Sequence, residues 1–77
     1  MKEVFDEIND ALGGTAVYEG ASSSNDAFYF SYNGDRHTLG IFGDFAILTN
    51  LSKQDYCRFV TTNLTSEIAE VIKRWQA

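Results

Sequence analysis

The chain has 77 residues, a formal net charge of −5 and one cysteine. This length supports one compact domain, residues 1–77, and the acidic balance argues against direct nucleic-acid binding, which needs clustered Lys and Arg. The lone Cys57 excludes an intramolecular disulfide framework and suits a reducing compartment. No apolar run is long enough to span a bilayer, and the acidic start differs from a signal peptide, so we expect a cytoplasmic protein without membrane contact.

The first expected element is a helix over residues 2–12. Five apolar residues recur at the spacing of one buried helix face: Val4, Phe5, Ile8, Ala11 and Leu12. Gly13-Gly14 should end this helix, because glycine adopts the left-handed conformation of a helix cap at little cost. Residues 15–19 then predict a short strand, and residues 20–26 (GASSSND) predict a polar loop that we expect to be flexible.

Residues 27–50 predict three antiparallel strands joined by two tight turns. Asn33-Gly34 is a strong hairpin signal, because a type I′ turn needs positive φ at both central residues, and Gly43-Asp44 fits type II′. Two-residue turns fix the register, which pairs Phe28 with Leu39, Phe30 with His37, Leu39 with Leu48, and Phe42 with Phe45.

Side-chain alternation divides these strands into two faces. The expected core face carries Phe28, Phe30, His37, Leu39, Ile41, Ala46 and Leu48. The other face carries Tyr29, Thr38, Gly40, Phe42, Phe45 and Ile47, and it is unusually apolar for the outer face of an antiparallel sheet. A helix, a second copy of the chain or a partner should cover part of it, and we favour a helix.

The C-terminal part of the chain predicts helix from Lys53 onward. Apolar side chains recur at helical spacing: Tyr56, Phe59, Val60, Leu64, Ile68, Val71, Ile72 and Trp75. Ser52 resembles an N-cap, with Asp55 completing a weak capping box. An unbroken helix to Gln76 would be about 36 Å long, so we expect a break near residues 63–65, with Asn63 or Thr65 capping a second helix. The expected fold is α+β, in the order α-β-β-β-β-α-α, with a four-stranded antiparallel meander packed against helices.

The sequence contains no recognisable catalytic or metal-binding motif. Cys57 and His37 are the candidate nucleophile and base, but we interpret Cys57 as a small buried apolar residue and His37 as a partly buried sheet residue. One Cys and one His do not complete a structural zinc site, and no glycine-rich phosphate loop is present. We therefore predict no catalytic residues, no metal and no cofactor.

Two sets of side chains remain as candidate partner-binding surfaces. The first would form an acidic patch: Glu3, Asp6, Glu7, Asp10, Glu19, Asp26 and Asp35. Carboxylates spaced in this way imitate a row of phosphates and favour a basic partner. The second is apolar and suits a partner or an oligomer: Tyr29, Phe42, Phe45, Ile47 and Trp75.

These features predict a small non-enzymatic interaction protein. The hypothesis is an inhibitor that binds and blocks a larger protein or ribonucleoprotein complex with a basic, nucleic-acid-handling surface. In size, acidity and single-domain organisation the profile is similar to that of phage-encoded inhibitors of host defence, such as anti-CRISPR proteins and DNA mimics. The alternative is a homo-oligomeric structural or adaptor module, for example a homodimer, that uses the apolar sheet face and the C-terminal helix.

Overall fold

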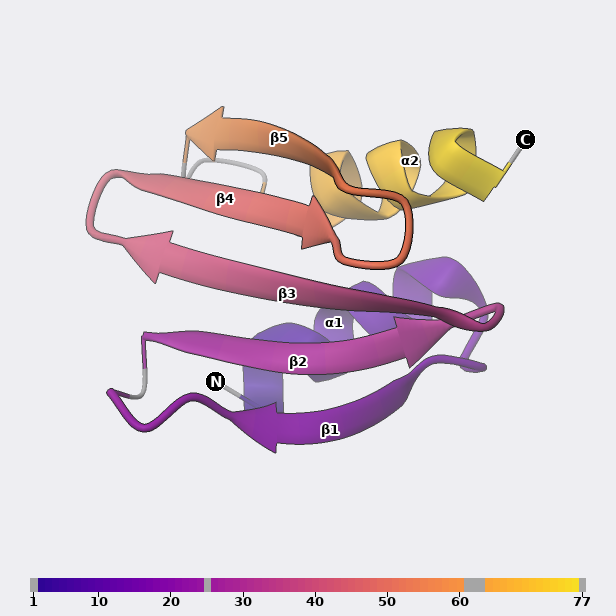
Figure 1. Cartoon of the computed structure of the whole chain (residues 1–77), viewed down its shortest axis with the longest axis horizontal. Coiled ribbons are helices and arrows are strands. Elements are labelled where there is room, and N and C mark those ends of the chain that lie inside the picture. Colours follow the sequence, from indigo (N-terminus) through magenta and orange to yellow (C-terminus); the bar gives the residue numbers. More distant parts are fainter. Residues whose placement is uncertain (1, 25, 61–63, 77) are drawn as a thin grey trace.

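The computed structural model describes residues 2–24, 26–60 and 64–76. Its elements are helix α1 (Lys2–Leu12), strands β1 (Val17–Ala21), β2 (Ala27–Tyr32), β3 (Asp35–Phe42), β4 (Phe45–Asn50) and β5 (Asp55–Val60), and helix α2 (Leu64–Gln76). The five strands form one antiparallel sheet in chain order, and both helices lie behind it in Figure 1. The chain is therefore a small α+β domain with two layers.

The predicted N-terminal helix is confirmed, because α1 begins at Lys2 and ends at Leu12. Gly13 and Gly14 have φ angles of 97° and 88°, and the Gly14 N–H donates to the Asn9 carbonyl at 2.8 Å. The Asn9 side chain then accepts the Ala16 N–H at 2.9 Å, which directs the chain into β1. Strand β1 continues to Ala21 and so includes the first residues of the predicted loop 20–26. The flexibility of that loop stays a prediction, and Asn25 lies outside the described residues.

The two central turns are formed as the sequence predicts. Asn33 and Gly34 have φ angles of 51° and 84°, and Gly43 has a φ of 71°. Positive φ at these positions is what the I′ and II′ hairpin turns require. The predicted register is confirmed in every pair: Phe28 with Leu39, Phe30 with His37, Leu39 with Leu48, and Phe42 with Phe45.

The helix predicted from Lys53 is wrong in its first half, because residues 55–60 form the fifth strand. Strand β5 pairs with β4 from Asn50↔Asp55 to Phe45↔Val60. Ser52 is not a helix cap: its hydroxyl accepts the backbone N–H of Arg36 at 3.0 Å. The order is therefore α-β-β-β-β-β-α, with a five-stranded sheet in place of the predicted four.

The turn before β5 explains this outcome. The Asn50 side chain accepts the Lys53 N–H at 2.9 Å, and Gln54 adopts a positive φ of 61°. The chain thereby reverses direction, and backbone pairing with β4 becomes available to a segment rich in Tyr, Cys, Phe and Val, which suit a pleated strand. The predicted second helix is present as α2; its predicted cap Asn63 lies outside the described residues, and Thr65 lies in the first turn of α2.

The hydrophobic core lies between the helices and the adjacent face of the sheet. Its fully buried strand residues include Phe28, Phe30, Leu39 and Leu48, as the alternation predicted. The helices contribute Phe5, Ile8, Leu12, Ile68, Ala69, Val71 and Ile72. Phe5 joins α1 to the first two strands, since its ring lies 5.3 Å from Tyr18 and 5.8 Å from Phe30, centroid to centroid. Among the described residues, neither helix has the length and apolar character needed to cross a membrane.

The strand assignment of residues 55–60 makes a prediction that separates it from the helical interpretation. The predicted helix would place Tyr56 and Phe59 on the same apolar face. In the strand they lie on opposite faces of the sheet: Phe59 is 6% exposed and Tyr56 is 76% exposed. We expect Phe59→Ala to lower the free energy of unfolding by about 3–5 kcal/mol, because it empties a core position. Tyr56→Ala should cost at most about 1 kcal/mol. Urea unfolding of both variants measures this, and similar losses would contradict the strand.

Candidate interaction surface

The face of the sheet opposite the helices is left open by the described residues. We expected a second helix to cover part of it, but α1 and α2 both pack on the core face (Figure 1). The reason is the fifth strand: residues 55–60 are used in the sheet, and the apolar stripe of the remaining helix, with Ile68 and Ile72, is buried in the same core as α1. The apolar outer face predicted from the sequence is therefore present and uncovered by either helix.

Strand register and side-chain alternation define the residues of this surface, which we call the open face. It comprises Val17 and Glu19 from β1, Ala27, Tyr29 and Ser31 from β2, Arg36, Thr38, Gly40 and Phe42 from β3, Phe45, Ile47 and Thr49 from β4, and Tyr56, Arg58 and Val60 from β5. Four of the five predicted apolar site residues are here: Tyr29, Phe42, Phe45 and Ile47. The structure brings them together on adjacent strands.

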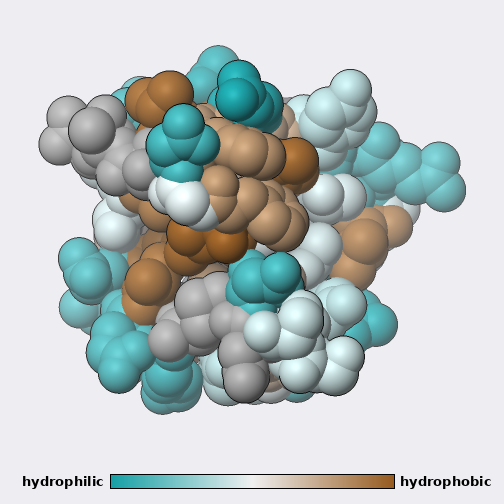
Figure 2. Space-filling view, turned by 90° about the vertical axis from the view of Figure 1, so that its left-hand side faces the viewer, coloured by the Kyte–Doolittle hydropathy of each residue, from teal (hydrophilic) through white to brown (hydrophobic). Residues whose placement is uncertain are grey.

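One end of the open face is an apolar cluster. Phe42, Phe45 and Val60 stand in one row across three strands, and the two phenylalanine rings lie 5.5 Å apart, centroid to centroid. Phe42 is 42% exposed and Val60 58% exposed. The Arg58 guanidinium lies 4.7 Å from the centroid of the Phe45 ring, within reach of a cation–π interaction. Figure 2, which looks onto this end of the molecule, shows hydrophobic side chains gathered near its centre.

Gly40 allows the Phe42 ring to lie against the sheet. A Cβ atom at Gly40 would come within 2.6 Å of the Phe42 Cζ, so any larger residue would push the ring away. The ring forms one wall of a shallow groove of about 240 Å³. The groove is lined by Ala27, Thr38, Gly40, Phe42, Ile47 and Thr49. The open face is therefore an apolar surface that contains a shallow groove.

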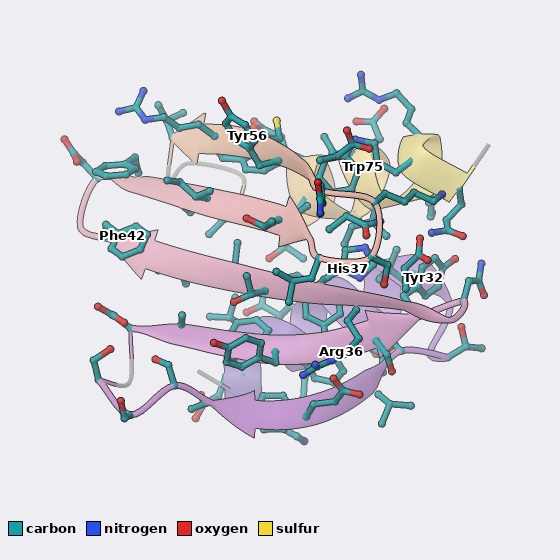
Figure 3. The ribbon with its side chains drawn as sticks, in the orientation of Figure 1. Tyr32, Arg36, His37, Phe42, Tyr56 and Trp75 are labelled. Carbon is teal, nitrogen blue, oxygen red and sulfur yellow. The ribbon has the colours of Figure 1, made fainter. Side chains whose placement is uncertain are left out.

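Polar and aromatic side chains border this apolar cluster. Tyr29, Thr38, Thr49 and Tyr56 form a continuous row across β2 to β5. Beyond it, the Arg36 Nε donates to the Glu19 carboxylate at 3.1 Å, and the Arg36 guanidinium lies 5.9 Å from the Tyr29 ring centroid. Figure 3 shows Phe42 and Arg36 at different ends of the same strand. The open face thus has an apolar cluster at one end and polar and aromatic side chains toward the other, and protein–protein interfaces combine apolar and polar area in this way.

The contribution of β5 to this surface was not predicted from the sequence. Tyr56, Arg58 and Val60 were assigned to a helix, because Tyr56, Phe59 and Val60 also fit helical spacing. The composition of residues 55–60, DYCRFV, could have indicated a strand, because Tyr, Cys, Phe and Val favour strands. When this segment pairs with β4, its more buried residues, Cys57 and Phe59, alternate with exposed ones. Arg36 was identifiable from alternation within β3, since it precedes the core residue His37.

The seven acidic residues of the predicted patch do not form one surface. Glu3, Asp6, Glu7 and Asp10 lie on the exposed side of α1, where Asp6 pairs with Lys2 at 3.2 Å. The other three are elsewhere: Glu19 on the open face, Asp26 in the β1–β2 connection beside Ser24, and Asp35 at the start of β3. The structure therefore retains only the helix part of the predicted patch.

Asp35 is a structural anchor. Its Oδ2 accepts hydrogen bonds from Asn50 Nδ2 at 3.1 Å and from Gln76 Nε2 at 3.0 Å, and it lies 3.5 Å from Lys53 Nζ. The Asn50 hydrogen bond, followed by that of Gln76, holds the pKa of the Asp35 carboxyl below its usual value. Trp75, the fifth predicted apolar residue, lies at this end on the core side, where its carbonyl accepts Lys53 Nζ at 2.8 Å.

His37 and Cys57 are not arranged as a nucleophile and a base. His37 is fully buried, and its Nε2 has no hydrogen-bond partner among the described residues. Cys57 lies on β5, where its Sγ approaches the Arg58 carbonyl at 3.8 Å. Within residues 2–24, 26–60 and 64–76, no three His, Cys, Asp or Glu side chains cluster in a way that would hold a metal ion.

Comparison with known proteins adds no assignment. Neither a protein-family model, nor a curated protein, nor a solved structure matches the chain. The geometry of the open face and the distribution of charge are therefore the features of the molecule that bear on its function.

The Asp35 anchor predicts a defined pH dependence of stability. Because the folded-state pKa of Asp35 is lowered from 3.8, its contribution is present above that value and is lost as the pH falls through the folded pKa. Asp35→Asn should therefore destabilise the protein at neutral pH, and the difference from wild type should shrink below pH 3.8.

Urea unfolding from pH 7 to pH 2.5 measures the effect. The control Asp44→Asn removes an exposed turn carboxylate and should alter the free energy of unfolding by at most about 0.5 kcal/mol. A difference between wild type and Asp35→Asn that stays constant with pH would contradict the anchoring role.

Proposed function

We propose that the protein is a non-catalytic interaction protein that binds a larger protein through the open face and blocks it. The observation that supports this proposal is the uncovered row of Phe42, Phe45 and Val60, on the same face of the sheet as the exposed Tyr56. Large contiguous apolar patches are rare on the surface of monomeric proteins, and where they occur they commonly mark an interaction site.

The composition of the open face fits a protein partner. Tyr, Phe and Arg are enriched at the energetic centres of interfaces, and here Arg58 stacks on Phe45 while Arg36 is already paired with Glu19. The molecule measures 30 × 24 × 24 Å. One side therefore offers on the order of 700 Å², close to the roughly 800 Å² that each partner contributes to a standard interface.

A second candidate surface is the exposed side of α1, with Glu3, Asp6, Glu7 and Asp10. In this version the protein docks on a larger basic, nucleic-acid-handling protein or ribonucleoprotein and occupies its phosphate-binding surface. The net charge of −5 supports it. Exposed charge pairing is screened by salt, whereas apolar contact is not, so the two candidates differ in their salt dependence.

The two surfaces also lie on opposite sides of the molecule, so substitutions separate them. One bait carries Phe42→Ser and Phe45→Ser on the open face. A second carries Glu7→Lys and Asp10→Lys on α1. The matched charge control carries Glu67→Lys and Glu70→Lys on the exposed side of α2. Each is used with wild type to capture partners from bacterial lysate at low and high salt.

We expect the Phe42→Ser, Phe45→Ser bait to capture at least tenfold less partner than wild type, equivalent to a loss of about 1.4 kcal/mol in binding free energy. The α2 control should retain it at both salt concentrations. Loss confined to the α1 variant, together with release by salt, would instead support the acidic surface. A partner bound equally by all four baits would contradict both versions.

A homodimer through the open face is the remaining alternative. Light scattering after size-exclusion chromatography distinguishes it, because wild type would then have twice the mass of the Phe42→Ser, Phe45→Ser variant. A monomeric mass for both would exclude the homodimer and leave the larger partner.

A further inference from the structure

In the described part of the chain, the core side of the molecule contains one fully buried titratable side chain, His37, which is not part of the open face. The His37 ring is stacked between two aromatic rings, with Phe30 at 5.0 Å and Trp75 at 6.3 Å between centroids, and with interplanar angles of 7° and 15°. His37 is fully buried. Figure 3 shows His37 and Trp75 at the same end of the sheet.

This environment accommodates only the neutral imidazole. The His37 Nδ1 lies 3.1 Å from the Asp35 carbonyl, which only accepts hydrogen bonds, so Nδ1 carries the proton. The Nε2 atom is buried without a partner among the described residues. Protonation there would create a buried charge and an unpaired donor between two aromatic rings, which is strongly unfavourable.

The two aromatic rings that flank His37 differ in how easily they can be displaced. Phe30 is fully buried in the second strand and paired with β1 and β3. Trp75 is half-buried and belongs to the last turn of α2, which ends at Gln76. Helix ends open locally at far lower cost than central strands. Water therefore reaches Nε2 most readily by displacement of the last turn of α2.

Polar contacts hold that turn against the sheet. Lys53 Nζ donates to the Trp75 carbonyl at 2.8 Å, and Gln76 Nε2 donates to Asp35 Oδ2 at 3.0 Å. Asp35 and Lys53 are also the charged groups that act on the His37 ring, from β3 and from the β4–β5 turn. Asp35 favours the imidazolium and Lys53 opposes it, while Asn50 from β4 and Gln76 from α2 are neutral.

We propose that His37 and Trp75 form an acid-sensitive latch: protonation of His37 displaces Trp75 and releases the last turn of α2 from the sheet. In the released form the strands and α1 should stay folded, because the core residues Phe5, Phe28 and Leu48 lie outside this turn. The latch is a local conformational device, and it is independent of the partner that the open face binds.

The direction of the pH response follows from burial. Burial lowers the pKa of His37 from 6.5, against smaller opposing effects of the Asp35 carbonyl and carboxylate. The unfolded or released chain thus binds the proton more readily than the closed form does. The closed latch is fully stable above pH 6.5 and loses stability as the pH falls through and below this value.

The chain contains one tryptophan and one histidine, so both halves of the latch have unambiguous signals. The experiment follows Trp75 fluorescence and far-ultraviolet circular dichroism of the full chain from pH 8 to pH 5, the range in which histidine titrates. Nuclear magnetic resonance of the His37 ring protons reports its protonation over the same range. The control His37→Phe keeps an aromatic stack without a titrating group.

We expect Trp75 emission to shift to longer wavelength in step with His37 protonation, while the sheet signal in circular dichroism is retained. In His37→Phe the emission should not change with pH. A shift that persists in His37→Phe, loss of the sheet signal at the same midpoint as the Trp75 shift, or no shift down to pH 5 would each overturn the latch.

Discussion

The register of the three central strands is the constraint on which the rest of this structure depends. The Asn33-Gly34 and Gly43-Asp44 turns each leave two residues outside the ladder, so Phe28, Phe30, Leu39 and Leu48 must share one face. A shift of one residue would reverse every side chain to the other side of the sheet. The same constraint also places Phe42, Phe45 and Ile47 together on the opposite face, so the core and the candidate interaction surface have a single origin.

The position of the helices follows from where apolar area is available for burial. The core face presents large buried side chains, and α1 and α2 each bury an apolar stripe against it. Because both helices are used there, Phe42 and Tyr56 on the open face stay exposed. A two-layer domain gains most of its stability from a single shared core, and Phe42 and Val60 stay outside it, exposed on the other face.

Polar anchoring is concentrated at the opposite end of the sheet from the apolar cluster. Asp35, Asn50 and Lys53 join the start of β3, the β4–β5 turn and the last turn of α2. His37 lies directly inside this network, stacked on Trp75. The molecule thus has an apolar end and an end fixed by polar contacts, and the exposed carboxylates of α1 lie on the helix side of the sheet.

The amino-acid sequence by itself determined the local features of this protein: helix α1 with its glycine cap, both hairpin turns, the central register and the two faces of the meander. These depend on backbone geometry at Asn33, Gly34 and Gly43 and on the period-two pattern, which act over a few residues. Most of the apolar part of the candidate site followed from the same pattern, at Tyr29, Phe42, Phe45 and Ile47.

Only the tertiary structure decided the conformation of residues 55–60, because their apolar spacing fits both a helix and a strand, and pairing with β4 provides the deciding hydrogen bonds. It also decided that both helices share one core, that the acidic residues are divided among four regions, and that Trp75 packs on His37, since each of these outcomes depends on contacts between segments distant in the chain.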